Sequence, residues 1–264
     1  MLQFHSANAG LPDDLWCHDC LLTNLYTEKY AARQISRADF WIACANAVIR
    51  QTSVHNGLNL RDTFEWGRVD SNVCPGSGPR LPSPRSCSQT ENVFLTRMGL
   101  TWTDATALMG AHTLGRGEIG FSGHGGTWVT NNNEAQVFDK AYYEEVFLNS
   151  WRPRNIGTPT EDWTTGDGAD RVMLNTDLCL VMEVEENMPC CTSTRCTGSG
   201  SGLSRCNRLP ANHPRSEAFE AFQDYLGGSY PNDNQVPFYG AFREAWRKAT
   251  KVGQNNLAPL ADNC

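Results

Sequence analysis

The chain has 264 residues, of which 40% are hydrophobic, and a formal net charge of −7. This length and composition predict a globular chain with one sizeable core. The negative charge argues against nucleic-acid binding, which requires a basic patch, and no apolar run reaches membrane-spanning length. We therefore expect neither a nucleic acid nor a membrane among the partners.

Helical spacing of the apolar residues predicts a mainly α-helical chain. A first helix is expected over 11–30, and Ser36 and Asp39 form a start signal for a second helix that ends near Gln51. Pro, Gly and Ser favour a loop over 52–88. Further helices are expected near 89–98, 103–115, 138–149, 216–225 and 237–251. In the last of these, one stripe predicts core packing: Phe238, Phe242, Ala245 and Trp246.

Eleven cysteines indicate disulfides formed in an oxidising compartment, and their odd number leaves one over. Four of them cluster in a Gly- and Ser-rich stretch, where crosslinks would replace packing: Cys190, Cys191, Cys196 and Cys206. Cys74 and Cys87 flank a loop that they could close. We expect an extracellular or secretory location. Residues 1–5 have no apolar core of a secretion signal, as expected if upstream sequence has been removed.

Zinc binding is a rival interpretation of the cysteines. Cys17 and Cys20 form a C-x-x-C pair, and Cys190 and Cys191 are adjacent. A second pair at finger-like spacing is missing, which disfavours a zinc site.

His112 lies in the apolar, small-residue stretch Ala107–Gly115. Thr101 and Asp104 form a helix-start signal upstream, and helical spacing then directs the imidazole inward. Gly110 and Gly115 are expected to let a flat, bulky group approach the backbone. His112 is thus a candidate ligand of a metal or a haem iron, and the alternative is a hydrogen-bonded histidine of the core.

Asp177 is a carboxylate among apolar residues in the stretch Met173–Leu180. An iron-bound histidine normally gives its second ring N–H to a carboxylate or carbonyl. Asp177 is a candidate partner of His112 on this ground. The alternatives are a helix cap and a salt-bridge partner.

Taken together, short motifs in a fixed order along the chain resemble the plant-type haem peroxidases. They are Ser6–Leu11, Ser36–Phe40, Trp66–Asp70, Arg80–Pro84, Met98–Leu100, Ala107–Gly115, Trp128, Phe138–Tyr143 and Met173–Asp177. The resemblance implies a two-lobed helical fold with haem b between a distal and a proximal lobe. It also implies one domain over 1–264, in which 1–100 is a remnant of the distal lobe and 101–264 is the proximal lobe.

The resemblance assigns roles to individual residues. His112 matches the proximal iron ligand, Asp177 its carboxylate partner, and Trp128 the indole beside the imidazole. Four residues are expected to contact the haem: Ala111, Gly115, Phe121 and Pro82. A proximal cation site, suited to Ca²⁺ or K⁺, is expected from Thr113, Thr130, Asn132, Val137 and Asp139. Thr130 and Asn132 are provisional because the spacing after Trp128 is longer than usual, and the alternative is a polar turn that caps the helix near Phe138.

The distal side departs from the family pattern. The family's distal arginine and histidine precede the segment that contains Asn8, and this chain starts almost at that segment. His5 and His18 imitate parts of the distal motif without its arginine. Asn8, which orients the distal histidine in relatives, would then have nothing to orient, and we expect severely reduced turnover.

The implied function is reduction of hydrogen peroxide with oxidation of small phenolic or aromatic donors, in the response to oxidative stress, by a monomer. Phe121 occupies the position of an arginine in ascorbate-oxidising relatives, which disfavours ascorbate. The alternative is a non-catalytic, disulfide-braced protein with the peroxidase fold, either a degenerate homologue or a truncated fragment.

Overall fold

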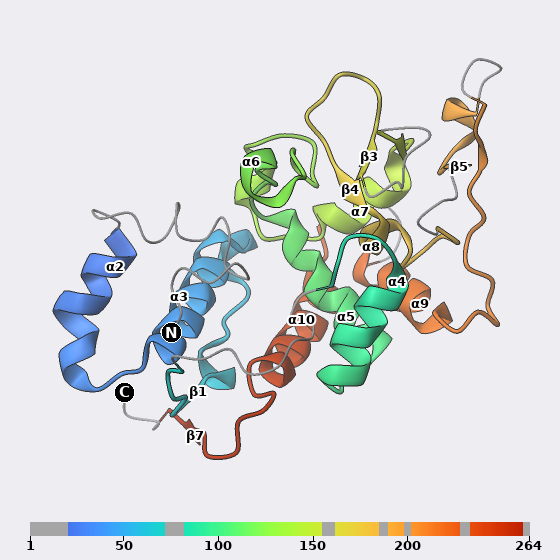
Figure 1. The fold of residues 1–264 in the computed structure, drawn as a ribbon. Helices are drawn as coiled ribbons and strands as arrows, with labels where there is room; N and C mark the ends of the chain where they lie inside the picture. Colours follow the sequence, from blue (N-terminus) through green and yellow to red (C-terminus); the bar gives the residue numbers. More distant parts are fainter. Residues whose placement is uncertain are drawn as a thin grey trace.

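A computed structural model describes residues 21–71, 82–154, 162–184, 190–197, 202–227 and 233–260. Its described part is mainly helical, which confirms the expected fold class (Figure 1). The α-helices are α2 (Leu21–Leu25), α3 (Arg37–Thr52), α4 (Cys87–Thr90), α5 (Trp102–Met109), α6 (Ile119–Ser122), α7 (Ala141–Leu148), α8 (Asn175–Leu178), α9 (Ser216–Tyr225) and α10 (Val236–Ala249). Two π-helical segments, Tyr26–Tyr30 and Glu91–Arg97, follow α2 and α4. Short 3-10 turns lie at Ala31–Arg33, Val54–Asn56, Arg61–Thr63, Gly110–Thr113, Glu134–Gln136 and Thr194–Cys196.

Both expected helix-start signals cap a helix. Ser36 Oγ accepts the backbone N–H of Asp39 at 3.0 Å at the start of α3. Thr101 and Asp104 form a capping box at the start of α5, where Thr101 Oγ1 accepts the Asp104 N–H at 3.1 Å. Each bond satisfies a backbone donor that has no partner within the helix. The first turn of α5, the helix that leads to His112, is therefore fixed locally.

The start of α3 is held by the segment Trp66–Asp70. Asp70 accepts the N–H groups of Arg37 and Ala38, each at 2.9 Å. Arg68 forms a buried ion pair with Asp39 at 2.7 Å. The charged residues of this segment thus have a structural role, which is to attach the loop before α4 to α3.

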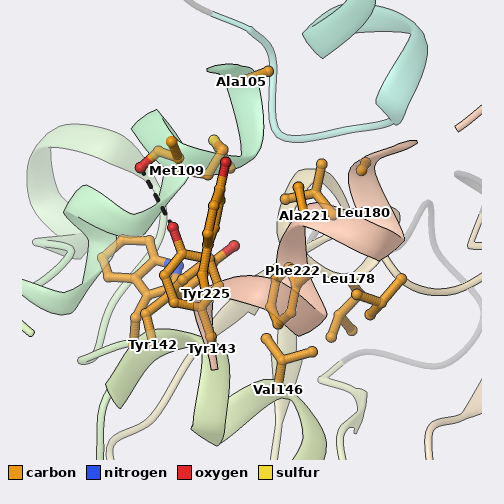
Figure 2. Close-up of a cluster of buried hydrophobic side chains, with 14 of the residues drawn as sticks. Ala105, Met109, Tyr142, Tyr143, Val146, Leu178, Leu180, Ala221, Phe222 and Tyr225 are labelled. Atoms are coloured by element: carbon orange, nitrogen blue, oxygen red, sulfur yellow. Dashed lines mark hydrogen bonds between the residues drawn. The ribbon is translucent and has the colours of Figure 1, made fainter. Parts of the chain in front are cut away.

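The core lies where α5 packs against α9 and α10. Figure 2 shows Tyr142, Tyr143 and Val146 of α7 beside Phe222 and Tyr225 of α9. The rings of Tyr143 and Phe222 meet edge to face with centroids 4.8 Å apart, a favourable aromatic geometry. The predicted stripe on α10 is confirmed: Phe238, Phe242 and Ala245 are buried and Trp246 packs against the core.

Three small sheets complete the described part of the chain. β1 (Glu65–Trp66) pairs antiparallel with β7 (Ala258–Pro259). β2 (Arg152–Pro153), β3 (Asp162–Thr164) and β4 (Met173–Leu174) form an antiparallel sheet in that order, with Trp163 opposite both Pro153 and Met173. β5 (Cys190–Cys191) pairs parallel with β6 (Ser204–Arg205). The three-stranded sheet leads directly into α8, and so positions Asp177.

The expected crosslinks within the cysteine cluster are confirmed as Cys190–Cys206 and Cys191–Cys196. The expectation that Cys87 closes a local loop with Cys74 is wrong, because Cys87 is bonded to Cys179, 92 residues further along the chain. This bond joins α4 to the residue after α8. Cys74 lies outside the described residues.

The disulfides also exclude zinc binding by Cys190 and Cys191. Within the described ranges, no three His, Cys, Asp or Glu side chains are arranged to hold a metal ion. Cys17 and Cys20 lie outside those ranges. Among the described helices, none combines the length and apolar character needed to cross a membrane.

Candidate functional site

His112 lies in a 3-10 turn, Gly110–Thr113, that follows α5. The α-helix ends at Met109, so the expected continuous helix to residue 115 is wrong at its last turn. The tighter turn leaves the His112 side chain 29% exposed instead of fully buried in the core. An imidazole held at the surface end of a buried helix can meet a ligand from outside the protein.

One ring nitrogen of His112 is held by Asp177. His112 Nδ1 lies 2.8 Å from Asp177 Oδ1, which leaves Nε2 as the second ring nitrogen. The Asp177 side chain has no exposed surface. A buried carboxylate requires hydrogen-bond donors, and His112 supplies one of them. The structure therefore brings together the two residues that the sequence paired across 65 positions.

Three further donors surround Asp177. Trp128 Nε1 donates to Oδ2 at 2.8 Å and the backbone N–H of Leu174 donates to the same oxygen at 2.7 Å. The Tyr142 hydroxyl donates to Oδ1 at 3.0 Å. The Leu174 bond caps α8, so the helix-cap role considered from the sequence coexists with the contact to His112. With four donors and no exposure, this carboxylate has one fixed orientation.

Trp128 also packs on the imidazole. The rings of His112 and Trp128 are stacked with centroids 4.3 Å apart and planes 23° apart. Trp128 thus restrains both the ring of His112 and, through its indole N–H, the carboxylate behind that ring.

Tyr142 was not predicted as a site residue, although it lies in the motif Phe138–Tyr143. Its ring contacts the His112 ring edge to face at 5.9 Å. Burial raises the pKa of the Tyr142 hydroxyl well above its usual value, and the nearby Asp177 charge raises it further. The phenol therefore stays protonated and acts as a donor. The available sequence signal was its place in the motif Phe138–Tyr143, which also contains the expected cation ligand Asp139.

The expectation for Gly110 is wrong. A Cβ at Gly110 would lie 2.2 Å from the Tyr143 hydroxyl and 2.6 Å from Phe238, so the missing side chain makes room for core aromatic rings. Gly115, by contrast, is exposed, has a φ of +76° and has open space where a Cβ would lie.

Exposed Ala111 and Gly115 flank the half-buried His112. His112 Nδ1 is already hydrogen-bonded to Asp177, and the small side chains of its neighbours leave the surface beside the ring uncovered. A flat group could therefore bind over this turn. Pro82, another expected haem contact, is partly buried. Phe121 lies in α6, but its side chain falls outside the described part of the structure, as do Asn8, His5 and His18.

Three of the five expected cation ligands lie together. Thr113 Oγ1 is 2.9 Å from Asp139 Oδ1 and 3.4 Å from the carbonyl oxygen of Val137. Burial raises the pKa of the Asp139 carboxyl, although hydrogen bonds from Ala141 and Thr113 oppose that effect. Asp139 Oδ1 also accepts the backbone N–H of Ala141, the first residue of α7, at 2.9 Å, so the alternative of a polar turn at this helix start fits the same contacts.

The two provisional cation ligands, Thr130 and Asn132, form hydrogen bonds with other side chains. Thr130 Oγ1 donates to Glu145 Oε1 at 2.6 Å, and Glu145 pairs with Arg171 at 3.1 Å. Asn132 Oδ1 accepts from Arg116 at 3.5 Å on the surface. Their assignment to a cation site stays a prediction.

A separate apolar cavity of about 590 Å³ lies between α2 and α3. Aromatic side chains line much of it, including Tyr26, Phe40, Trp41 and Trp246. None of its lining residues belongs to the cluster around His112.

Comparison with known proteins gives one family. A family model described as Peroxidase matches residues 6–188. L-ascorbate peroxidase 2, cytosolic, of Oryza sativa subsp. japonica is 33% identical over 145 residues, 54% of this chain and 51% of the relative. L-ascorbate peroxidase 3 of Arabidopsis thaliana is 44% identical over 83 residues, 31% of this chain and 28% of the relative. Cytochrome c peroxidase, mitochondrial, of Emericella nidulans is 29% identical over 183 residues, 68% of this chain and 45% of the relative. The chain spans about half the length of these relatives or less.

Proposed function

The chain belongs to the peroxidase family of plant- and fungal-type haem proteins, and on that premise we propose that it binds haem b through His112 and reduces hydrogen peroxide. The observation that carries the proposal is the 2.8 Å contact between His112 Nδ1 and Asp177 Oδ1. Because Nδ1 faces a carboxylate, Nε2 is the nitrogen that remains for iron. Bound haem would supply the redox-active iron at which peroxide is reduced.

The residues of the chain would hold and tune this ligand. The negative charge of Asp177 behind the Nδ1–H makes the imidazole a stronger donor to a metal. Trp128 stacks on the ring, so the imidazole is not free to turn. Ala111 and Gly115 leave the surface beside the ring open for a planar group.

We propose small phenolic or aromatic molecules as the electron donors. Two of the relatives carry ascorbate in their names. Where ascorbate-oxidising relatives have an arginine, however, this chain has Phe121, which has no positive charge to pair with anionic ascorbate. A phenylalanine at this position instead suits stacking with the ring of an aromatic electron donor. For the cation, we propose Ca²⁺ or K⁺ bound by Thr113, Asp139 and the carbonyl oxygen of Val137, since all three supply hard oxygen atoms.

The described disulfides support a location in an oxidising compartment. The three bonds involve six of the eleven cysteines. We propose the secretory pathway or the extracellular space on this ground.

Haem titration tests the proposal. The wild type should bind haem with a Soret band typical of histidine ligation, His112→Ala should lose that spectrum, and His213→Asn should keep it. His213 is a suitable control because its Nδ1 accepts the backbone N–H of Arg215 at 3.0 Å, a role that an asparagine oxygen can take over. Loss of haem binding by both variants, or by neither, would contradict the assignment of His112.

Turnover then separates the two functional alternatives. A haem-loaded peroxidase should consume peroxide faster with a small phenol than with ascorbate. Haem bound through His112 with no peroxide consumption would support the non-catalytic alternative, in which the fold is kept without the activity.

A further inference from the structure

A second, partly buried His–Asp pair lies outside the His112 cluster. His124 Nδ1 is hydrogen-bonded to Asp162 Oδ1, and the two side chains are 15% and 14% exposed. His124 follows α6, whereas Asp162 is the first residue of β3. The pair therefore connects two segments that are 38 residues apart in the sequence.

Arg154 reinforces this connection. Its Nη1 lies 4.0 Å from the other carboxylate oxygen of Asp162. Its Nη2 donates to the carbonyl oxygens of Gly125 at 3.1 Å and Arg171 at 3.4 Å. One carboxylate thus receives a histidine and an arginine, and the arginine also holds the backbone next to that histidine.

The segment held in this way is the α6 loop, residues 117–126. Its two ends are joined by a pair of backbone hydrogen bonds between Gly117 and Gly126, at 2.8 and 3.2 Å. A Cβ at Gly117 would lie 2.7 Å from the His124 carbonyl oxygen, so the loop closes tightly on itself. The loop begins five residues after His112 and ends two residues before Trp128.

The described charged side chains in and next to the loop also include Arg116, Glu118 and Asp170. Arg116 pairs with Asp170 at 2.6 Å, and both side chains are well exposed. Glu118 precedes α6 and is exposed. Surface pairs of this kind contribute little to stability. His124 is the one histidine of residues 117–126, and histidine is the side-chain type whose ordinary pKa lies between pH 5 and 8.

We propose that the His124–Asp162 pair is a pH-dependent latch, which holds the α6 loop on β3 when His124 is protonated and loosens it when the proton is lost. The protonated pair is a charge-assisted hydrogen bond, which is roughly twice as strong as a neutral one. Loss of the proton leaves Asp162 with Arg154 as its charged partner and weakens the bond from the loop. The latch requires no haem, so it stands or falls separately from the proposed function.

Hydrogen exchange tests the latch. Protection factors of the Gly117 and Gly126 amides, corrected for the intrinsic rate at each pH, are measured on the full chain from pH 5 to 8. The wild type should lose roughly tenfold in protection across this range, the equivalent of one pK unit of coupling. Constant protection would overturn the proposal.

Two variants make the test specific. In His124→Asn, the amide keeps a neutral donor near the Nδ1 position, so protection should no longer change with pH. The control Asp170→Asn removes the exposed Arg116–Asp170 ion pair next to the loop and should keep the wild-type pH dependence. A pH dependence that persists in His124→Asn would overturn the latch. Should that variant fail to fold, the imidazole titration of His124 by NMR in the wild type must coincide with the loss of protection, and a titration at a clearly different pH would overturn it equally.

Discussion

The hydroxyl of Tyr142 donates a 3.0 Å hydrogen bond to Oδ1 of Asp177, the same carboxylate oxygen that faces His112. The two donors therefore share one acceptor atom. A substitution that removes the Tyr142 hydroxyl should therefore change the strength of the hydrogen bond between Asp177 and the Nδ1–H of His112, without altering the imidazole itself.

Tyr142→Phe should lower the free energy of unfolding by about 1 kcal/mol, the typical contribution of one hydrogen bond. It should also lower the reduction potential of the haem-loaded protein, because Asp177 then pulls more strongly on His112 and makes it a more anionic ligand. Denaturant unfolding and a redox titration measure the two effects.

The matched control is Tyr143→Phe. The Tyr143 hydroxyl donates to the backbone oxygen of Thr106 at 3.0 Å and has no contact with Asp177 among its hydrogen bonds. This variant should lose a similar amount of stability and leave the potential unchanged. Equal shifts of potential in both variants would contradict the specific role of Tyr142.

Alkaline pH should destabilise the fold through its buried tyrosines. Burial raises the pKa values of Tyr142, Tyr143 and Tyr225 above the usual value of about 10. Because the folded-state pKa values exceed the unfolded ones, this contribution to stability is fully present below about pH 10 and decreases as the pH rises above it. Phenolate absorbance should therefore appear together with loss of helical circular dichroism. Ionisation of all seven tyrosines near pH 10 in a folded chain would contradict this.

Gly110→Ala should destabilise the chain by roughly 3 kcal/mol, because overpacking forces core rings to move. The Cβ would meet the Tyr143 hydroxyl and the Phe238 ring. Gly240→Ala is the control, since Gly240 lies exposed within α10 and has nothing within 4 Å of a Cβ. That variant should gain about 1 kcal/mol of stability from helix propensity. Thermal unfolding distinguishes the two, and equal effects would contradict the packing around Gly110.

The sequence predicted the pairing of His112 with Asp177 and the proximity of Trp128, because these residues lie in short motifs with a recognisable order. Start signals such as Ser36 and Thr101 were equally readable, since capping is a local interaction. The role of Gly110 was not predictable, because it depends on Phe238, far away in the sequence. A glycine in a motif shows that space is needed but does not show what fills it.

The partner of Cys87 was missed for a related reason. Sequence proximity favours a short crosslink to Cys74, whereas Cys179 comes near Cys87 only after α4 packs against α8. The end of α5 was also misjudged, because the α-helix changes to a 3-10 turn at Gly110, a residue type with low helix propensity.

Removing the Cys87–Cys179 disulfide by a double alanine substitution should lower stability by roughly 4 to 5 kcal/mol, because the bond closes a long loop in the unfolded chain. Removing Cys191–Cys196, which spans 5 residues, should lower it by only about 2 kcal/mol. Denaturant unfolding of the two double variants gives the comparison. A larger loss from the short crosslink would show that loop length does not determine the effect here.

Resonance Raman spectroscopy of the reduced, haem-loaded protein tests the central assignment most directly. Labelling with ¹⁵N-histidine should shift an iron–imidazole stretching band, and Asp177→Asn should move that band to lower frequency, because the imidazole then loses its anionic partner. A band that is unaffected by the histidine label, or that persists unchanged in His112→Ala, would contradict iron ligation by His112.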